Sequence, residues 1–300
     1  MTQFDSGRPD SMERITLVAK PSSDYELLDS GREEKLERYG RFVLVRPDPQ
    51  ALWEKILGAK EWDGADGRYV RSGRAGEWHV NKDLPKQWDI SFGGLKVRIK
   101  PTSFKHTGLF PEQEPNWAWI RDTITSAGRP ASVINLFGYT GGATLAAAQA
   151  GAEVTHVDAS KTAVAWAREN ATLSGLGEKP IRWIVEDVLV FVRREIKRGK
   201  RYDLILMDPP AFGHGPKDEL WKIEEHLLEL MHLCSELLSS NPLGILINGY
   251  AAGYSPLAFA YNLEPFVKKF GGGLHYGDLT IAQKDGRLLP AGIYARWTNR

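Results

Sequence analysis

The chain has 300 residues, and its 39 Lys and Arg against 38 Asp and Glu give a formal net charge of +1. Nucleic-acid-binding proteins often carry a strong basic excess, so any contact with nucleic acid must involve a local patch. A single cysteine excludes an intramolecular disulfide and a cysteine-rich zinc site, and we expect no metal. No run approaches the ~20 apolar residues of a membrane span, and no signal peptide is evident, so we predict a soluble cytoplasmic protein.

The first third of the chain predicts a small β-rich domain over residues 15–105, after a loose polar terminus at 1–14. The short pieces ITLVA, RFVLV, RYVRS and LKVRIK have strand character and alternate with turn clusters. One helix is predicted at 49–58, with Asp48 as its N-cap. The charged stretch at 31–38, GREEKLER, is interpreted as a solvent-exposed face.

Residues 106–300 predict an α/β domain in which buried strands alternate with helices. The predicted strands are 132–137, 153–158, 181–186, 202–208 and 244–249, and the predicted helices lie near 142–150, 160–174, 188–198, 218–239 and 255–270. This alternation predicts a Rossmann-like, doubly wound, mostly parallel sheet. Two β-like pieces joined at Asp285-Gly286 predict an antiparallel hairpin at the C-terminal end.

A glycine-containing loop, GYTGG, follows the first of these strands and precedes a helical run. Glycines allow a sharp turn, and a helix N-terminus presents unpaired amides to a carboxylate or phosphate. Asp158 ends the next strand, where a carboxylate can accept hydrogen bonds from ribose hydroxyls. Asp187 follows the third strand and could contact an adenine amino group. The alternatives are a tight turn without ligand and, for Asp158, a helix cap.

The spacing of the glycines bears on the cofactor, because an NAD site normally presents GxGxxG. Here Tyr139 and Thr140 separate the glycines, an arrangement better suited to an amino-acid carboxylate than to a pyrophosphate. NAD therefore remains the less favoured ligand.

The sequence DPPAF continues the fourth strand, at the carboxyl end where open α/β sheets place their sites. Two prolines fix the backbone, so Asp208 and the Pro209 carbonyl can act as acceptors for an exocyclic amino group. After Pro210 and Ala211, Phe212 could stack on a planar base. The alternative is a strand terminator that caps the helix at 218–239. Nearby His214 is interpreted as a loop histidine.

GYTGG, the strand end Asp158-Ala159-Ser160, DPPAF and HTGLFPEQ at 106–113 together resemble the S-adenosylmethionine (SAM)-dependent methyltransferases that modify large-subunit ribosomal RNA, both the cytosine-C5 and guanine members. The resemblance implies SAM as the cofactor and Phe110 and Gln113 as contacts to it. The family segment reads TGxFxDQR, and this chain departs from it at Glu112 and Glu114. The residues that the resemblance places at the methionine part are Asn135, Phe137, Gly138, Thr140, Gly141 and Gly142. It places Asp158, followed by Ala159 and Ser160, at the ribose and Asp187 near the adenine.

Cytosine-C5 methylation needs a thiolate, because the ring carbon must be activated by covalent addition. In the C5 members that thiolate follows the fifth strand, where this chain reads INGYAAGYSP without cysteine. Cys234 lies in an apolar helical run and is interpreted as a packing residue. Transfer to a nitrogen, with Asp208, Pro209, Pro210 and Phe212 at the acceptor, is therefore favoured.

The substrate is less constrained than the cofactor. The N-terminal region interleaves tryptophans with cations, which suits RNA or, alternatively, the core and surface of a small β module. These residues are Trp53, Trp62, Trp78, Trp88, Arg68, Arg71, Arg74, Lys82 and Lys86. We expect an N-methyltransferase acting on RNA, with ribosomal RNA as the leading candidate. A protein or small-molecule N-methyltransferase, a SAM- or RNA-binding protein without turnover, and a dehydrogenase remain as alternatives.

Overall fold

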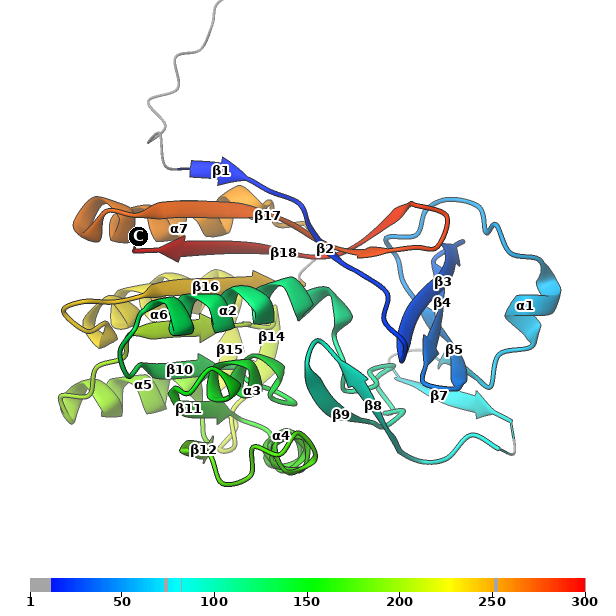
Figure 1. Cartoon of the computed structure of the whole chain (residues 1–300), viewed down its shortest axis with the longest axis horizontal. Helices are drawn as coiled ribbons and strands as arrows, with labels where there is room; N and C mark the ends of the chain where they lie inside the picture. The colour runs from blue at the N-terminus through cyan, green and yellow to red at the C-terminus, as the bar shows by residue number, and fades with distance from the viewer. Residues whose placement is uncertain (1–11, 73–74, 82, 251–252, 300) are drawn as a thin grey trace, which may run out of the picture.

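A computed structural model describes residues 12–72, 75–81, 83–250 and 253–299, and it contains a large sheet flanked by helices beside a smaller β-rich unit (Figure 1). Of the cations singled out in the N-terminal region, Arg74 and Lys82 lie outside the described residues. No described helix has the length and apolar character needed to cross a bilayer.

The large sheet has nine strands in the order β1-β17-β18-β16-β13-β10-β11-β12, and β2 also pairs with β17. Its strands are β1 (Met12–Arg14), β2 (Leu17–Ala19), β10 (Ser132–Leu136), β11 (Glu153–Asp158), β12 (Ile181–Val185), β13 (Leu204–Met207), β16 (Gly244–Gly249), β17 (Gly273–Ala282) and β18 (Leu288–Thr298). The strands β16, β13, β10, β11 and β12 run parallel, whereas β18 is antiparallel to both β16 and β17. The predicted doubly wound sheet with a C-terminal antiparallel hairpin is confirmed.

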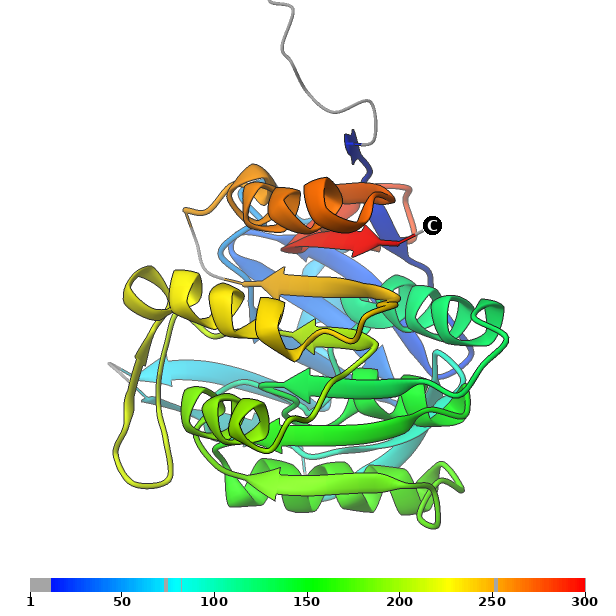
Figure 2. The same cartoon turned by 90° about the vertical axis from the view of Figure 1, so that its left-hand side faces the viewer.

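Helices cover both faces of this sheet because successive residues of each buried strand face opposite sides. Val133 packs in the core beneath α2 and α3, and its neighbour Ile134 packs in the core beneath α5, α6 and α7. Figure 2 shows the second group of helices in front of the sheet. The helices of this domain are η1 (Pro111–Gln113), α2 (Glu114–Ser126), α3 (Gly142–Gln149), α4 (Lys161–Leu173), α5 (Val188–Lys197), α6 (Ile223–Leu237) and α7 (Pro256–Phe270).

The β-rich unit consists of a five-stranded sheet, β3-β4-β5-β6-β7, and the separate hairpin β8-β9. Its elements are β3 (Tyr25–Gly31), β4 (Glu34–Tyr39), β5 (Phe42–Pro47), the short helix α1 (Ala59–Asp63), β6 (Gly67–Ser72), β7 (Ala75–Val80), β8 (Trp88–Phe92) and β9 (Leu95–Ile99). Tyr25 and Phe92 belong to the same apolar core as Trp117 of α2. The unit is therefore packed against the helices on one side of the large sheet, with a shared apolar core.

Two connections tie the β-rich unit to the far edge of the large sheet. The end of the β17–β18 hairpin reaches over the unit in Figure 1, where Gln283 donates to Asp29 Oδ1 at 3.1 Å. At the other end of the chain, β1 and β2 pair in parallel with β17. Residues 12–14 were expected to belong to a loose terminus, but they form a strand that pairs with the outer edge of β17. The domain division near residue 105 stays a prediction.

The prediction of a helix at 49–58 is wrong, because hydrogen bonds with residues distant in the sequence hold this segment in a non-helical conformation. The buried Asp29 carboxylate accepts hydrogen bonds from the amides of Ile56 and Leu57, at 3.0 and 2.8 Å. The carbonyls of Ala51 and Trp53 accept from the turn between β3 and β4. These backbone groups are therefore satisfied by tertiary contacts, and the only helix nearby is the five-residue α1.

The charged stretch at 31–38 is not simply a solvated face. It forms the turn and the strand β4, and both Leu36 and Glu37 are buried. Glu37 accepts two hydrogen bonds from the Arg46 guanidinium, at 2.7 and 2.9 Å. A bidentate ion pair of this kind allows a carboxylate to be buried in the centre of the unit.

The helix predicted at 218–239 begins later than expected, at Ile223 of α6. The preceding residues form an antiparallel hairpin of β14 (Phe212–His214) and β15 (Leu220–Lys222). The interpretation of DPPAF as a cap on a helix at 218 is wrong in this respect, because β15 separates the two.

Candidate active site

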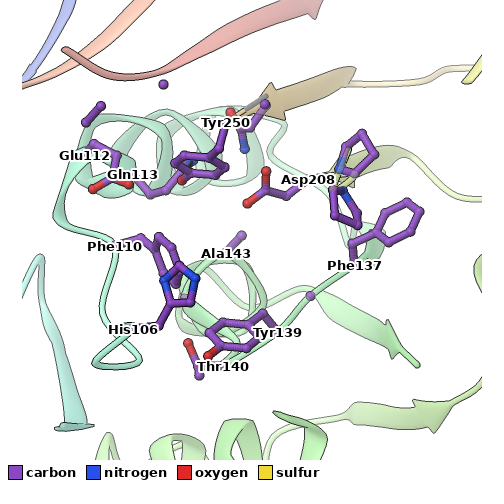
Figure 3. A pocket seen from close by; sticks show the side chains of 18 of the residues that line it. His106, Phe110, Glu112, Gln113, Phe137, Tyr139, Thr140, Ala143, Asp208 and Tyr250 are labelled. Carbon is purple, nitrogen blue, oxygen red and sulfur yellow. Dashed lines mark hydrogen bonds between the residues drawn. The ribbon is translucent and has the colours of Figure 1, made fainter. Parts of the chain in front are cut away.

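A cavity of about 920 Å³ opens at the carboxyl ends of β10, β11, β13 and β16 and extends to the β-rich unit (Figure 3). This edge of a doubly wound sheet is the usual position of a ligand site. Of the site residues predicted from the sequence, all except Phe212 line the cavity. They are Phe110, Gln113, Asn135, Phe137, Gly138, Thr140, Gly141, Gly142, Asp158, Ala159, Ser160, Asp187, Asp208, Pro209 and Pro210.

The loop between β10 and α3 has an unusual backbone. Phe137 and Tyr139 have positive φ values of 57° and 44°, and Gly141 has a φ of 90° and caps α3. Non-glycine residues with positive φ are uncommon and concentrate at functional sites. Gly142 and Ala143 line the cavity in the first turn of α3, where helix amides have no partner within the helix.

Two glycines of this loop are required by close packing. A Cβ at Gly138 would lie 2.4 Å from His156 Cε1, and a Cβ at Gly142 would lie 2.3 Å from Trp117 Cζ2. The absence of a side chain at these two glycines thus allows the loop to pack closely against His156 and Trp117. This packing holds the start of α3 against the cavity.

A buried polar cluster supports the loop from below. Thr144 Oγ1 accepts a hydrogen bond from Asn135 Nδ2 at 2.9 Å and lies 2.9 Å from His156 Nδ1. Burial lowers the pKa of His156 to about 3, so the imidazole is neutral. Thr140 Oγ1 donates to the Gly108 carbonyl at 2.7 Å and joins the loop to the segment at 106–113.

Asp158, at the end of β11, accepts a hydrogen bond from a backbone amide with each of its two carboxylate oxygens. Oδ2 accepts from Tyr139 N at 2.9 Å, and Oδ1 accepts from Ser160 N at 2.8 Å. The N-cap of α4 is Ser160, so Asp158 is not a helix cap. Each carboxylate oxygen retains a further lone pair, so the side chain can still accept from a ligand in the cavity.

Asp187 is the N-cap of α5, and its Oδ1 accepts from Val190 N at 2.9 Å. It is buried and also lines the cavity, as Asp158 and Ala159 do. The assignments of these residues to ribose and adenine stay predictions.

The segment at 106–113 forms the opposite wall and is fixed through its amide side chain. Gln113 Nε2 donates to the Tyr250 hydroxyl at 2.6 Å, and Gln113 Oε1 accepts from Asn116 Nδ2 at 3.0 Å. Asn116 also donates to Asn248 Oδ1 at 2.9 Å. Phe110 lies with its ring centroid 5.6 Å from that of Tyr139 and 5.7 Å from that of Tyr250. Tyr250 was not predicted as a site residue.

Asp208 follows β13 and projects into the cavity opposite this wall (Figure 3). Its Oδ1 is buried and has no hydrogen-bond partner among the described residues. Burial and the charge of Glu112 raise the pKa of Asp208 to about 7. The Pro210 carbonyl is engaged by Trp221 Nε1 at 2.7 Å, which fixes the double-proline turn. A buried acceptor without a partner is costly and is typical of a functional group.

Glu112 is a second carboxyl in the same cavity that the sequence did not single out as a site residue. It is only 5% exposed, and burial raises its pKa to about 7. Figure 3 shows Tyr250 between Glu112 and Asp208. The charge of Glu112 contributes, after burial, to the raised pKa of Asp208, so the ionisation of Glu112 bears on the protonation state of Asp208.

Phe212 differs from the other predicted transfer residues. Its side chain is 56% exposed on β14 and does not line the cavity, and its ring contacts His214 with centroids 5.0 Å apart. Its predicted stacking on a substrate base stays a prediction. Cys234 is fully buried in the core beneath α6, away from the cavity lining.

Residues 49–254 match the model of a family described as S-adenosylmethionine-dependent methyltransferase. The chain belongs to this family. The recognition made from the motifs is therefore confirmed, and SAM is the cofactor of the family.

Among curated proteins, the chain is similar to ribosomal RNA large subunit methyltransferase K/L of Shewanella sp. strain MR-4, with 33% identity over 151 residues. That stretch is 49% of this chain and 21% of the relative. The protein of the same name from Methylococcus capsulatus is 33% identical over 153 residues, which are 51% of this chain and 19% of that protein. The chain thus matches about a fifth of the length of these relatives.

Among solved structures, a SAM-dependent methyltransferase from Agrobacterium tumefaciens is similar over 96% of this chain and 95% of its own, with a TM-score of 0.92 and 40% identity. A putative methyltransferase complexed with SAH has a TM-score of 0.70 and 18% identity, covering 92% of this chain and 76% of its own. The second likeness concerns the fold alone.

The cavity fits the cofactor in size and in donors. A volume of about 920 Å³ is within the range of small-molecule sites. Its walls offer the Asp158 carboxylate, the first amides of α3 and the rings of Phe110 and Tyr139. These groups suit, respectively, ribose hydroxyls, a carboxylate and an apolar or cationic chain.

Proposed function

We propose that this protein transfers a methyl group from SAM to a nitrogen of an RNA base. The observation that carries the proposal is Asp208, whose buried Oδ1 has no partner among the described residues and faces the cavity. An ionised carboxylate is an acceptor without donors, so it selects a group that carries an N–H. An exocyclic amino group of a base has this property.

When bound, SAM supplies an electrophilic methyl group on a sulfonium. The Asp208 carboxylate accepts a hydrogen bond from the amino group, which orients the nitrogen lone pair. A nitrogen–carbon bond forms as the sulfur–carbon bond breaks, and the nitrogen loses a proton that Asp208 can hold. Because the pKa of Asp208 is raised to about 7, its carboxylate is a better proton acceptor than an ordinary aspartate.

A base nitrogen is favoured over the cytosine C5 carbon because the described part of the cavity offers no thiol, and Cys234 is buried elsewhere. RNA is favoured because the relatives named above are ribosomal RNA methyltransferases. The aromatic side chain of Tyr250 in the cavity offers a ring for a flipped or single-stranded base. An RNA substrate of this kind would be met in the cytoplasm, where we propose that the protein acts.

The proposal is tested with the full chain and SAM carrying a tritiated methyl group. The acceptors are total RNA, ribosomes undermodified by growth with a methyltransferase inhibitor, and a protein extract. We expect label in RNA, and nuclease digestion followed by chromatography should assign it to a base nitrogen. Label at C5 of cytosine would contradict the nitrogen assignment, and label only in protein would contradict the RNA assignment.

A protein or small-molecule amine is the second candidate, because Asp208 and the double-proline turn would serve any N–H acceptor. The labelled protein extract decides between them. Calorimetry with SAM is the control, since a chain that does not bind SAM would remove both candidates.

A further inference from the structure

The cavity has a second end, formed by the β-rich unit, whose chemistry differs from that around Asp208. Lys35 of β4, Arg46 of β5 and Lys105 line it. Arg46 is paired with Glu37 at 2.7 Å, and Lys35 Nζ lies 3.1 Å from Asp48 Oδ2. Two of the three cations are therefore matched by two carboxylates.

Lys105 is the cation in excess. Its Nζ donates to the Pro47 carbonyl at 3.4 Å, and the described residues place no carboxylate within ion-pair distance of it. Burial, followed by the charges of Lys35 and Arg46, lowers the pKa of Lys105, and Asp48 opposes this only in part. A partly buried ammonium among other cations is unfavourable unless an anion offsets it.

The position of Lys105 is fixed by its backbone. The residue has a φ of 64°, in the left-handed region, and its carbonyl accepts a hydrogen bond from Arg46 Nη1 at 3.3 Å. Residues other than glycine adopt this backbone conformation at a cost in free energy, which the surrounding structure must offset. The hydrogen bonds to Arg46 and to the Pro47 carbonyl thus hold the backbone and the ammonium of Lys105 at the cavity wall.

Aromatic rings connect this end to the transfer end. His106 lies with its ring centroid 5.5 Å from that of Phe110, which in turn neighbours Tyr139 and Tyr250. Burial and the neighbouring cations lower the pKa of His106 to about 4, so its ring is neutral at pH 7. A cation next to a row of rings is the combination that holds single-stranded nucleic acid, where phosphates pair and bases stack.

We propose that Lys105, supported by Lys35 and Arg46, binds a phosphate group of the RNA strand next to the nucleotide that enters the cavity. This assignment rests on the proposed function for the identity of the polymer. It gives the β-rich unit a defined part in substrate binding, although the net charge of the chain is only +1. The recognised group is a phosphate diester, and an acidic peptide is the competing source of an anion.

The test measures binding of a fluorescein-labelled, mixed-sequence ten-nucleotide RNA by fluorescence anisotropy, in the presence of saturating SAH and across a salt series. The variants are Lys105→Gln and the charge-retaining Lys105→Arg. The control is Lys96→Gln, which removes an exposed lysine of β9 that does not line the cavity. Calorimetry with SAM and thermal unfolding accompany each variant.

We expect Lys105→Gln to weaken RNA binding by about 10-fold and to reduce the slope of log affinity against log salt by ~0.7, the amount for one lost phosphate contact on a single strand. Lys105→Arg and Lys96→Gln should bind like the wild type, and all variants should bind SAM normally.

Three outcomes would overturn the inference. Equal RNA binding by Lys105→Gln and wild type would remove the phosphate site while leaving methyl transfer intact. A loss of SAM affinity in Lys105→Gln, with RNA binding unchanged, would assign the anion to the cofactor. Binding of a poly-glutamate peptide in place of RNA, sensitive to Lys105→Gln, would assign it to protein. Absence of SAM binding by the wild type would instead count against the proposed function.

Discussion

Two aspartates stand at equivalent places in the fold, and they are used differently. Asp158 ends β11 and Asp208 follows β13, both at the carboxyl edge of the sheet. Asp158 has both oxygens on backbone amides, whereas Asp208 has a buried oxygen without a described partner. The first carboxylate fixes the loop between β10 and α3, and under the proposed function the second is left for the substrate. We therefore propose that the same residue type at the same edge serves cofactor binding in one case and methyl transfer in the other.

Substitution of Asp208 is expected to have the largest effect on methyl transfer, and it tests the difference between the two aspartates most directly. Asp208→Ala should lower the single-turnover methyl-transfer rate by ~10³-fold, the range for loss of a positioned acceptor in a transition state. Its affinity for SAM, measured by calorimetry, should stay within about 2-fold of the wild type, because binding and transfer are separated. Asp208→Asn, which keeps the shape, should show most of the same loss. Full transfer activity in either variant would refute the assignment.

Asp158 should show the opposite pattern. Asp158→Ala removes the hydrogen bonds from the amides of Tyr139 in the loop and of Ser160, together with the proposed ribose acceptor. It should weaken SAM binding by ~100-fold, since hydrogen bonds to charged groups contribute about 1.5–3 kcal/mol. At saturating SAM the transfer rate should recover to near the wild-type value. A variant with normal SAM affinity and a low rate would reverse the roles of the two aspartates.

Gly138 tests the packing that supports the loop held by Asp158. Gly138→Ala places a Cβ 2.4 Å from His156 Cε1, and overpacking of this kind should cost about 1–3 kcal/mol of unfolding free energy. Denaturant unfolding of the ligand-free protein measures the cost. Gly273→Ala is the control, because nothing lies within 4 Å of its Cβ position and Gly273, like Gly138, has no positive φ. If the two variants lose equal stability, the His156 contact does not explain the result.

The pH profile sharpens the account of Asp208. Its pKa is raised to about 7, and the carboxylate is the active form, so the transfer rate should rise as the pH increases through 7. Glu112→Gln removes a charge that raises this pKa, and the midpoint of the profile should move to lower pH. An unchanged midpoint would mean that Glu112 does not act on Asp208.

The same two carboxyls predict a change in stability with pH. The folded-state pKa values of Asp208 and Glu112 lie above ordinary unfolded values, so the stability gained from their protonated forms is present below pH 4 and is lost as the pH rises through 7. Glu112→Gln should reduce this loss, as measured by denaturant unfolding between pH 5 and 8.

The smallest effect is expected at Cys234. Cys234→Ala should cost ~1 kcal/mol of stability through a small cavity beneath α6, and should leave the transfer rate unchanged. Loss of transfer with normal folding would reopen a covalent mechanism.

The loop after β10 and the double-proline turn after β13 could be predicted because their signals are local. Glycines, prolines and strand ends follow one another in the sequence, and the parallel sheet brings their carboxyl ends to one edge. The glycine loop and Asp158 are therefore predictable from local signals, whereas the position of Asn135 follows from the family resemblance.

The residues that the sequence did not indicate are those whose environment comes from distant segments. Tyr250 is fixed by Gln113, 137 residues earlier, and Glu37 is buried because Arg46 of the next strand neutralises it. The segment at 49–58 has a helix-forming composition, but two of its backbone amides donate hydrogen bonds to the Asp29 carboxylate instead of to helix carbonyls. Propensity is a weak prior, and such tertiary hydrogen bonds override it.

The pairing of β1 and β2 with β17 determines how the two units of the protein can be studied separately. Removing the first 105 residues would also remove these two strands and uncover the ten-residue β17 as a free sheet edge, which invites aggregation. The two ends of the described chain meet in one sheet, with Met12 opposite Leu274 and Leu274 opposite Trp297. Circular permutation, with the ends linked and a new opening in a surface turn, is therefore a better way than truncation to separate the contributions of the two units.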